Sequence, residues 1–148
     1  MTVFYSMRHT INFGSPKVAE QVYDLWVQTE TACSDLDPVG YSIERNILLS
    51  ALDIVASGDI AIDIGDLGSF LAGLNIDRDG KEVISFSQGS DDGDIEPSGG
   101  CLIIDWTSMR YFIMDTSAVM MMLESGDLSV NELPGQWFNS SGEEITAP

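Results

Sequence analysis

Four carboxylates fall close together on a glycine-rich stretch, and their spacing makes them the first candidates for chemistry. They are Asp91, Asp92, Asp94 and Glu96, inside GSDDGDIEPSGG at residues 89–100. Carboxylate oxygens at this spacing can bind a hard divalent cation, but the surrounding glycines make the loop flexible and therefore a poor preformed cage. We interpret residues 89–100 as a mobile acidic loop that is solvated or faces a partner, and we predict no metal site.

A second acidic segment shares part of the spacing of a calcium-binding loop. Residues 75–86, NIDRDGKEVISF, place Asp77, Asp79 and Gly80 at positions that such a loop uses. The last position requires a bidentate carboxylate, and here it is Phe86. Because the flanks are typical of strands and not of helices, the segment predicts a plain β-hairpin around an Asp79–Gly80 turn.

Residues suited to catalysis or cofactor binding are sparse. His9 is the single histidine, and no nucleophile elbow accompanies it, so we predict a histidine satisfied in the core or at a sheet edge, and no catalytic residue. The glycine runs match neither a phosphate-binding loop nor a dinucleotide fingerprint, which predicts no cofactor. A small enzyme using paired carboxylates stays open as an alternative, with candidates that flank apolar segments: Asp63, Asp66, Asp105 and Asp115.

The two cysteines, Cys33 and Cys101, lie far apart in the sequence, and Cys101 falls in an apolar run. This pattern favours reduced, unligated thiols over a disulfide or a metal site. The longest apolar runs are much shorter than a membrane span, and the first residues lack the layout of a secretory signal. We therefore expect a cytoplasmic protein that does not enter a membrane.

Charge is the strongest departure of this chain from ordinary composition. Its 148 residues contain 24 acidic and six basic side chains, for a formal net charge of −18. The basic residues are scattered singly, and none follows Arg110. A surface of this sign repels nucleic acid and anionic lipid and speeds encounter with a basic partner. We predict a basic protein partner and no binding to nucleic acid or membrane.

Aromatic side chains can supply affinity beside this charge. Trp26 fits the apolar stripe of a helix and Trp106 ends a strand, whereas Trp137 lies in a segment loose enough for an exposed anchor. Three consecutive methionines at residues 120–122 can form an adaptable face, although at least one of them must face the core. The predicted partner-binding site combines these side chains: Asp91, Asp92, Asp94, Glu96, Asp105 and Trp137.

These observations favour a binding inhibitor that occludes the nucleic-acid-binding or active-site surface of a basic partner, such as a toxin, a nuclease or a nucleic-acid-binding complex. Immunity proteins, antitoxins and phage anti-defence proteins that mimic DNA, including anti-CRISPR proteins, belong to this class. Two alternatives stay open. One is the carboxylate enzyme, and the other is a halophile-type protein whose charge only keeps it in solution.

The apolar pattern predicts a single acidic α+β domain over residues 1–148, with an antiparallel sheet of about four or five strands and helices mainly on one face. Two short runs within CLIIDWTSMRYFIMD are expected to form its central hairpin. The sheet is predicted to include these strands: Val3–Phe13, Lys81–Phe86, Cys101–Trp106 and Arg110–Met114.

Caps and helical spacing predict four helices. One begins at Pro16 after Ser15 and ends near Cys33, and another, with a broad apolar stripe, extends from Ser42 to Gly58. The rest are short, at residues 67–74 behind an Asp66 cap and at 118–125. Residues 59–64 are expected to form a short strand or a connection, residues 128–138 a helical or irregular segment, and residues 140–148 a frayed tail.

Overall fold

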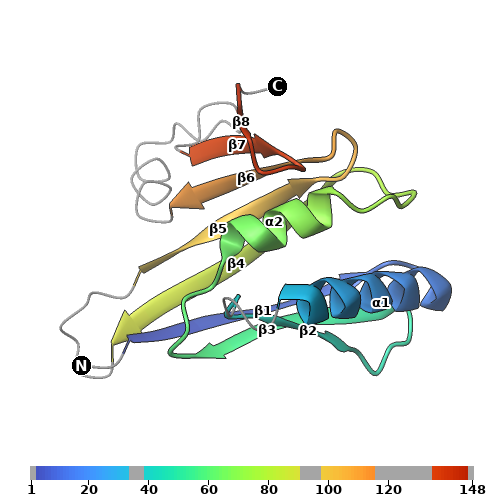
Figure 1. Ribbon diagram of the computed structural model, residues 1–148, viewed down its shortest axis with the longest axis horizontal. Coiled ribbons are helices and arrows are strands. Elements are labelled where there is room, and N and C mark those ends of the chain that lie inside the picture. Colours follow the sequence, from blue (N-terminus) through green and yellow to red (C-terminus); the bar gives the residue numbers. More distant parts are fainter. Residues whose placement is uncertain (1–2, 34–38, 91–97, 116–134, 147–148) are drawn as a thin grey trace.

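The computed structural model describes residues 3–33, 39–90, 98–115 and 135–146 of the chain. These residues form one antiparallel sheet and two helices (Figure 1). The strands are β1 (Val3–Asn12), β2 (Ser42–Arg45), β3 (Ala51–Gly58), β4 (Lys81–Ser90), β5 (Ser98–Asp105), β6 (Arg110–Asp115), β7 (Gly135–Asn139) and β8 (Glu144–Ile145). The helices are α1 (Pro16–Cys33) and α2 (Ile64–Ala72).

The sheet has eight strands in the order β2-β3-β1-β4-β5-β6-β7-β8. This mostly-β architecture corrects the predicted α+β domain with four or five strands. The additional strands come from segments that were predicted as helical or irregular, so the described part of the chain has more sheet and less helix than its apolar spacing indicated. β1, the first strand in the sequence, lies inside the sheet and pairs with both β3 and β4.

The segment from Ser42 to Gly58, predicted as a helix, is instead the β2–β3 hairpin. Ser42 pairs with Val55 and Ile43 with Ile54. The predicted apolar stripe has helical spacing, but a strand that is covered on both faces also shows a nearly continuous apolar run. The first four residues of β3 are all buried. Periodicity alone therefore could not separate the two structures.

Several predicted elements are confirmed. β1 matches the predicted alternation, and β5 and β6 form the predicted hairpin, with Ile103 opposite Phe112. α1 begins at Pro16 and ends at Cys33. Its first turn is held by Ser15, whose carbonyl accepts a 3.1 Å hydrogen bond from the Ala19 amide. Local signals were sufficient in these segments because capping residues and turn residues bound them closely.

α2 begins earlier than predicted because Asp63, and not Asp66, is its N-cap. The Asp63 Oδ1 atom accepts a 3.0 Å hydrogen bond from the Asp66 amide. The residues before this cap form a connection and no strand. β4 begins at Lys81 as predicted. The hairpin predicted around Asp79–Gly80 does not form, because residues 74–80 contain no strand. Gly80 instead contacts the β5–β6 turn. The Gly80 carbonyl accepts a 2.9 Å hydrogen bond from the Trp106 amide.

The end of the described chain is also a hairpin. The residues around Trp137, expected to be helical or irregular, form β7, and β8 pairs with it through Trp137 and Ile145. Gly142, with φ at +85°, makes the connecting turn, in which Asn139 Oδ1 accepts hydrogen bonds of 3.0 Å from the amides of Ser141 and Glu143. Residues 140–146 thus have defined structure where a frayed tail was expected.

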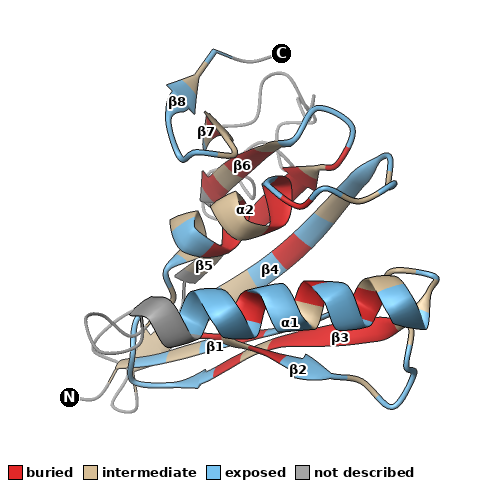
Figure 2. Cartoon of the chain, turned by 45° about the vertical axis from the view of Figure 1, so that its right-hand side comes forward, coloured by how far each residue is buried: buried red, intermediate tan, exposed pale blue. Residues whose placement is uncertain are grey.

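The core has two parts, one on each face of the sheet. Figure 2 shows that buried residues lie in the strands and on both helices. In the larger part, Val22 and Trp26 of α1 and Leu67 and Leu71 of α2 belong to one cluster with strand side chains such as Ile54. α1 lies against β2 and β3, and α2 lies against β5 and β6. The smaller part, on the opposite face, is a separate buried cluster: Cys101, Ile103, Phe112, Met114 and Trp137.

Neither described helix combines the length and apolar character needed to cross a membrane. Gly89 and Ser90 belong to β4, and residues 98–100 belong to β5, so the ends of the predicted acidic loop are strand residues. The remainder of that loop, the predicted helix at 118–125 and the methionines at 120–122 lie outside the described residues.

Candidate functional site

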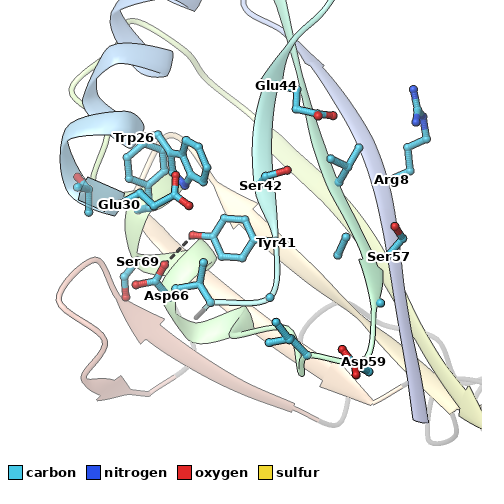
Figure 3. A pocket seen from close by; sticks show the side chains of 18 residues that line it. Arg8, Trp26, Glu30, Tyr41, Ser42, Glu44, Ser57, Asp59, Asp66 and Ser69 are labelled. Atoms are coloured by element: carbon cyan, nitrogen blue, oxygen red, sulfur yellow. Dashed lines mark hydrogen bonds between the residues drawn. The ribbon is translucent and has the colours of Figure 1, made fainter. Parts of the chain in front are cut away.

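A cleft of about 910 Å³ lies beside β2 on the described surface (Figure 3). Its wall contains residues from the last turns of α1, from β2 and the chain entering it, from the end of β3 and the chain that follows, from α2, and Arg8 from β1. A cleft of this volume has the size of a small-molecule or side-chain binding site. The end of the sheet near β2 therefore carries the candidate site.

Two buried aromatic rings form the floor of this cleft on the helix side. The rings of Trp26 and Tyr41 lie 6.3 Å apart between centroids and are tilted by 42°. The Tyr41 hydroxyl donates a 2.6 Å hydrogen bond to Oδ2 of Asp66. Burial raises the pKa of Tyr41 well above its ordinary value, and the Asp66 carboxylate raises it further. The hydroxyl therefore stays protonated and holds Asp66 in place as an acceptor.

Carboxylates outnumber cations around these rings. Glu30, Glu44, Asp59 and Asp66 are in the wall, and Arg8 is the one basic residue among the described residues that line it. In Figure 3, Glu30 and Asp66 lie on the same side as the aromatic rings, whereas Arg8 lies across β2 and β3 from them. The helix side of the cleft is thus anionic, with exposed carboxylates above buried rings.

The shape of the cleft depends on a close contact between two chain segments. Gly40 has φ at +77°, and a Cβ atom at this position would collide with the carbonyl oxygen of Ala61. The amide of Asp63 donates a 2.8 Å hydrogen bond to the carbonyl of Val39. Glycine is therefore required where the chain crosses the connection to α2, and this crossing directs Tyr41 toward α1.

This arrangement suits a cation. A guanidinium or ammonium group placed over Trp26 or Tyr41 is attracted by the face of the ring, and nearby carboxylates add Coulomb attraction. Phosphates and other anions would meet like charge. The geometry therefore supports recognition of an arginine or lysine side chain, or of a small organic cation.

The predicted partner-binding residues do not line the cleft. Asp91, Asp92, Asp94 and Glu96 lie outside the described residues. Asp105 instead holds the β5–β6 turn, where its Oδ1 atom accepts hydrogen bonds from the amides of Thr107 at 3.1 Å and Ser108 at 3.3 Å. Turn capping explains the position of this carboxylate without a partner.

Trp137, the predicted exposed anchor, is only 7% exposed. Its ring packs against Phe112 with 5.2 Å between centroids, on the sheet face opposite the helices. The indole is therefore a core side chain of that face. The adjacent Phe138 points to the other face, where it stacks on Tyr111 at 5.0 Å.

Each described carboxylate that was proposed for an enzyme has a structural role of its own. Asp63 caps α2, Asp66 accepts the Tyr41 hydroxyl, and Asp105 holds a turn. The side chain of Asp115 lies outside what the structure describes. Within the described ranges, no three His, Cys, Asp or Glu side chains come together as a metal site.

His9 lies on the helix side of β1 and contacts Glu82. Its Nε2 atom is 3.1 Å from Oε2 of Glu82, and Arg78 donates a 2.9 Å hydrogen bond to the other oxygen of that carboxylate. These contacts lower the pKa of Glu82, with the His9 bond as the main cause. His9 is thus a satisfied, partly buried histidine, as the sequence predicted. Cys101 is a buried free thiol, and the side chain of Cys33 lies outside the described residues.

Sequence reasoning missed the cleft because its residues come from five separated segments. Trp26 was interpreted as a core side chain, which is correct, but this side chain also borders the cleft. One local signal was present. Glu30 follows Trp26 by four residues in α1, and this spacing places both on one side of a helix.

No protein-family model, curated protein sequence or solved structure matches the chain. The cleft and the charge of the molecule are therefore the features that point to a function.

Proposed function

We propose that this protein is an acidic binding protein that inhibits a basic protein partner by covering its nucleic-acid-binding or active-site surface. The observation that carries the proposal is the cleft beside β2, where Trp26 and Tyr41 lie beside Glu30 and Asp66, and Glu44 belongs to the wall across β2. An arginine or lysine side chain of the partner would enter this cleft. The net charge of −18 supports the proposal, because it speeds approach to a basic surface.

The cleft and the overall charge make separate contributions to such a complex. Long-range attraction depends on the total charge and is screened by salt within about 8 Å at physiological ionic strength. The cleft acts at contact distance, where cation–π attraction contributes about 0.5–2 kcal/mol according to how far the cation is desolvated. Association rate is therefore expected to follow net charge, and dissociation rate to follow the cleft.

A direct test uses tri-arginine amide as the probe and tri-citrulline amide as its neutral isostere. Isothermal titration calorimetry at low and moderate salt should show that the protein binds tri-arginine and not tri-citrulline. The double variant Glu30→Gln/Glu44→Gln should bind tri-arginine about 3–10-fold more weakly, since each exposed carboxylate contributes less than about 1 kcal/mol.

The matched control is Asp77→Asn/Asp79→Asn, which removes the same charge from exposed positions that do not line the cleft. This variant should retain nearly the full affinity. Equal losses in the two double variants would show that only net charge matters, and equal binding of the two peptides would show that the cleft does not recognise a guanidinium.

The partner itself can be identified with a photo-crosslinking amino acid in place of Glu44. A basic protein should be captured at this position and not from the same probe at Asp77. The purified partner should then lose its nucleic-acid binding or catalytic activity when the acidic protein is added. A captured protein whose activity is unaffected would contradict inhibition while leaving cation binding intact.

A further inference from the structure

Three consecutive aliphatic side chains project from the turn between β2 and β3. Ile47 is 96% exposed, Leu48 58% and Leu49 76%. Single apolar residues on a surface are ordinary, but a contiguous group on a small protein typically marks an interaction site. We call these three residues the β2–β3 tip. The apolar character of the tip contrasts with the high charge of the chain, which carries 24 acidic side chains.

The β2–β3 tip is held in a fixed conformation. Asn46 Oδ1 accepts a 2.8 Å hydrogen bond from the Leu48 amide, and the Leu48 carbonyl accepts a 2.9 Å bond from the Ala51 amide. The Asn46 Nδ2 atom donates a 2.8 Å bond to Asp53, a buried carboxylate of β3. Binding therefore needs little further ordering of this turn, which favours affinity.

The tip follows β2, whereas Tyr41, at the aromatic floor of the cleft, precedes it. This strand has four residues, so the tip and the aromatic floor are separated by about 13 Å along the strand, and Glu44 of the cleft wall lies between them. Beside the tip, Leu49 borders a smaller hollow of about 250 Å³ whose wall includes Pro16, Ala19 and Leu52. The β2 edge of the molecule thus carries two features. The β2–β3 tip and its apolar hollow follow the strand, and the aromatic floor of the anionic cleft precedes it.

We infer that the β2–β3 tip is the apolar anchor for a basic, amphipathic segment of a protein partner. The inference rests on the proposed function, because the same segment would place a cationic side chain in the cleft while its apolar face covers the tip. Buried aliphatic contacts supply affinity that screened charges do not, and the carboxylates select a segment with basic flanks.

The charge and the area of the tip argue against two other occupants. A second copy would bring another net charge of −18 into contact, and a stable dimer buries about 800 Å² per subunit, much more than three aliphatic side chains supply. Anionic lipid would meet the same repulsion. A basic protein segment satisfies both the apolar and the electrostatic character of this edge.

The test uses a labelled helical peptide of leucine and arginine with all leucines on one face, and a scrambled peptide of the same composition. Fluorescence anisotropy should show that the protein binds the amphipathic peptide more tightly. The triple variant Ile47→Ser/Leu48→Ser/Leu49→Ser should bind it about tenfold or more weakly, because three aliphatic contacts are lost. Its melting temperature should be unchanged, since these side chains are exposed.

The control variant replaces three exposed apolar side chains elsewhere, Phe4, Val83 and Met109, by serine. It should bind the amphipathic peptide like the unmodified protein. If the triple tip variant fails to fold, Ile47→Ser alone, at the most exposed position, should weaken binding several-fold. Unchanged affinity in a folded tip variant would overturn the inference.

The outcomes also separate this inference from the proposed function. If tip variants bind the amphipathic peptide normally while Glu30→Gln/Glu44→Gln weakens tri-arginine binding, the tip inference fails alone. If neither peptide binds the unmodified protein, both fail. A dimer that is seen by analytical ultracentrifugation and is lost in the tip variant would show that a second copy, and not a basic protein segment, binds the tip. Flotation with phosphatidylcholine vesicles that depends on the tip would show that the tip binds a membrane instead.

Discussion

Gly68 of α2 lies directly against the ring of Tyr111 in β6. A Cβ atom on Gly68 would be 2.5 Å from Cδ2 of that ring, and Tyr111 is buried. The Tyr111 hydroxyl is also 3.2 Å from Ser69 Oγ in the same helix. The glycine therefore allows α2 to approach the sheet closely at this point, next to Ser69, which belongs to the cleft wall.

Alanine substitutions in α2 should have opposite effects at its two glycines. Gly68→Ala forces the helix away from Tyr111 and should lower the free energy of unfolding by about 1–3 kcal/mol. Gly65→Ala is the matched control, because its Cβ atom would meet nothing closer than 3.6 Å. It should raise the free energy of unfolding by up to about 1 kcal/mol through helix propensity. Urea denaturation of both variants measures these values, and a stable Gly68→Ala protein would contradict the close contact.

Glu82→Gln should remove a stabilising contribution that depends on pH. At neutral pH the loss should be about 1–3 kcal/mol, because a partly buried carboxylate loses its charge beside His9 and Arg78. The folded-state pKa of Glu82 is lowered, so the contribution is complete above the ordinary glutamate pKa and disappears as pH falls through the folded value. The stability difference between the two proteins should therefore shrink as pH falls below the ordinary glutamate pKa of about 4.3 and through the lower folded-state value. A stability difference that does not change with pH would contradict the contacts of the Glu82 carboxylate with His9 and Arg78.

Asp53→Ala should loosen the β2–β3 tip without unfolding the protein. Thr10 donates a 2.5 Å hydrogen bond and Asn46 a 2.8 Å bond to this buried carboxylate, and both donors would be left unsatisfied. The expected loss is about 1–3 kcal/mol. Hydrogen exchange should accelerate most at the Leu48 amide, which donates its hydrogen bond to Oδ1 of Asn46. Protection at Leu48 that survives in Asp53→Ala would show that the turn does not depend on this network.

Substitution of Trp137 should affect stability and leave cation binding unchanged. Trp137→Ala removes a buried ring that packs on Phe112 and should cost about 3–5 kcal/mol. Trp137→Phe keeps much of the apolar volume and provides a folded protein for titration with tri-arginine, which should bind normally. Faster peptide dissociation from a fully stable Trp137→Phe protein would restore this residue as a binding anchor.

Local signals in the sequence were enough for elements that carry their own boundaries. α1 is bounded by Ser15 and Pro16 at its start, and the β5–β6 hairpin contains two short apolar runs around a polar turn. β2 and β3 were mistaken for a helix because burial on both faces of β3 removes the alternation that identifies a strand. The choice between the two structures is made by pairing with β1, a long-range contact.

The cleft depends on such contacts to a greater degree. Trp26, Tyr41 and Asp66 belong to three segments whose proximity follows from the sheet order and from the crossing at Gly40. Composition nevertheless identified the dominant property of this surface, its negative charge. The specific acidic loop at residues 91–96 stays a prediction, and Asp105 and Trp137 have structural roles in the turn and the core.

β1 pairs on one side with β4, a strand that is synthesised much later than β1. Met7 lies opposite Ala56 of β3 on one side and opposite Phe86 of β4 on the other. A nascent chain can therefore assemble β1, α1, β2 and β3 while the second side of β1 still has unpaired backbone donors and acceptors. Such an edge recruits strands from neighbouring chains. Slow synthesis between Gly58 and Lys81 would lengthen this interval and favour aggregation on polysomes over completion of the sheet.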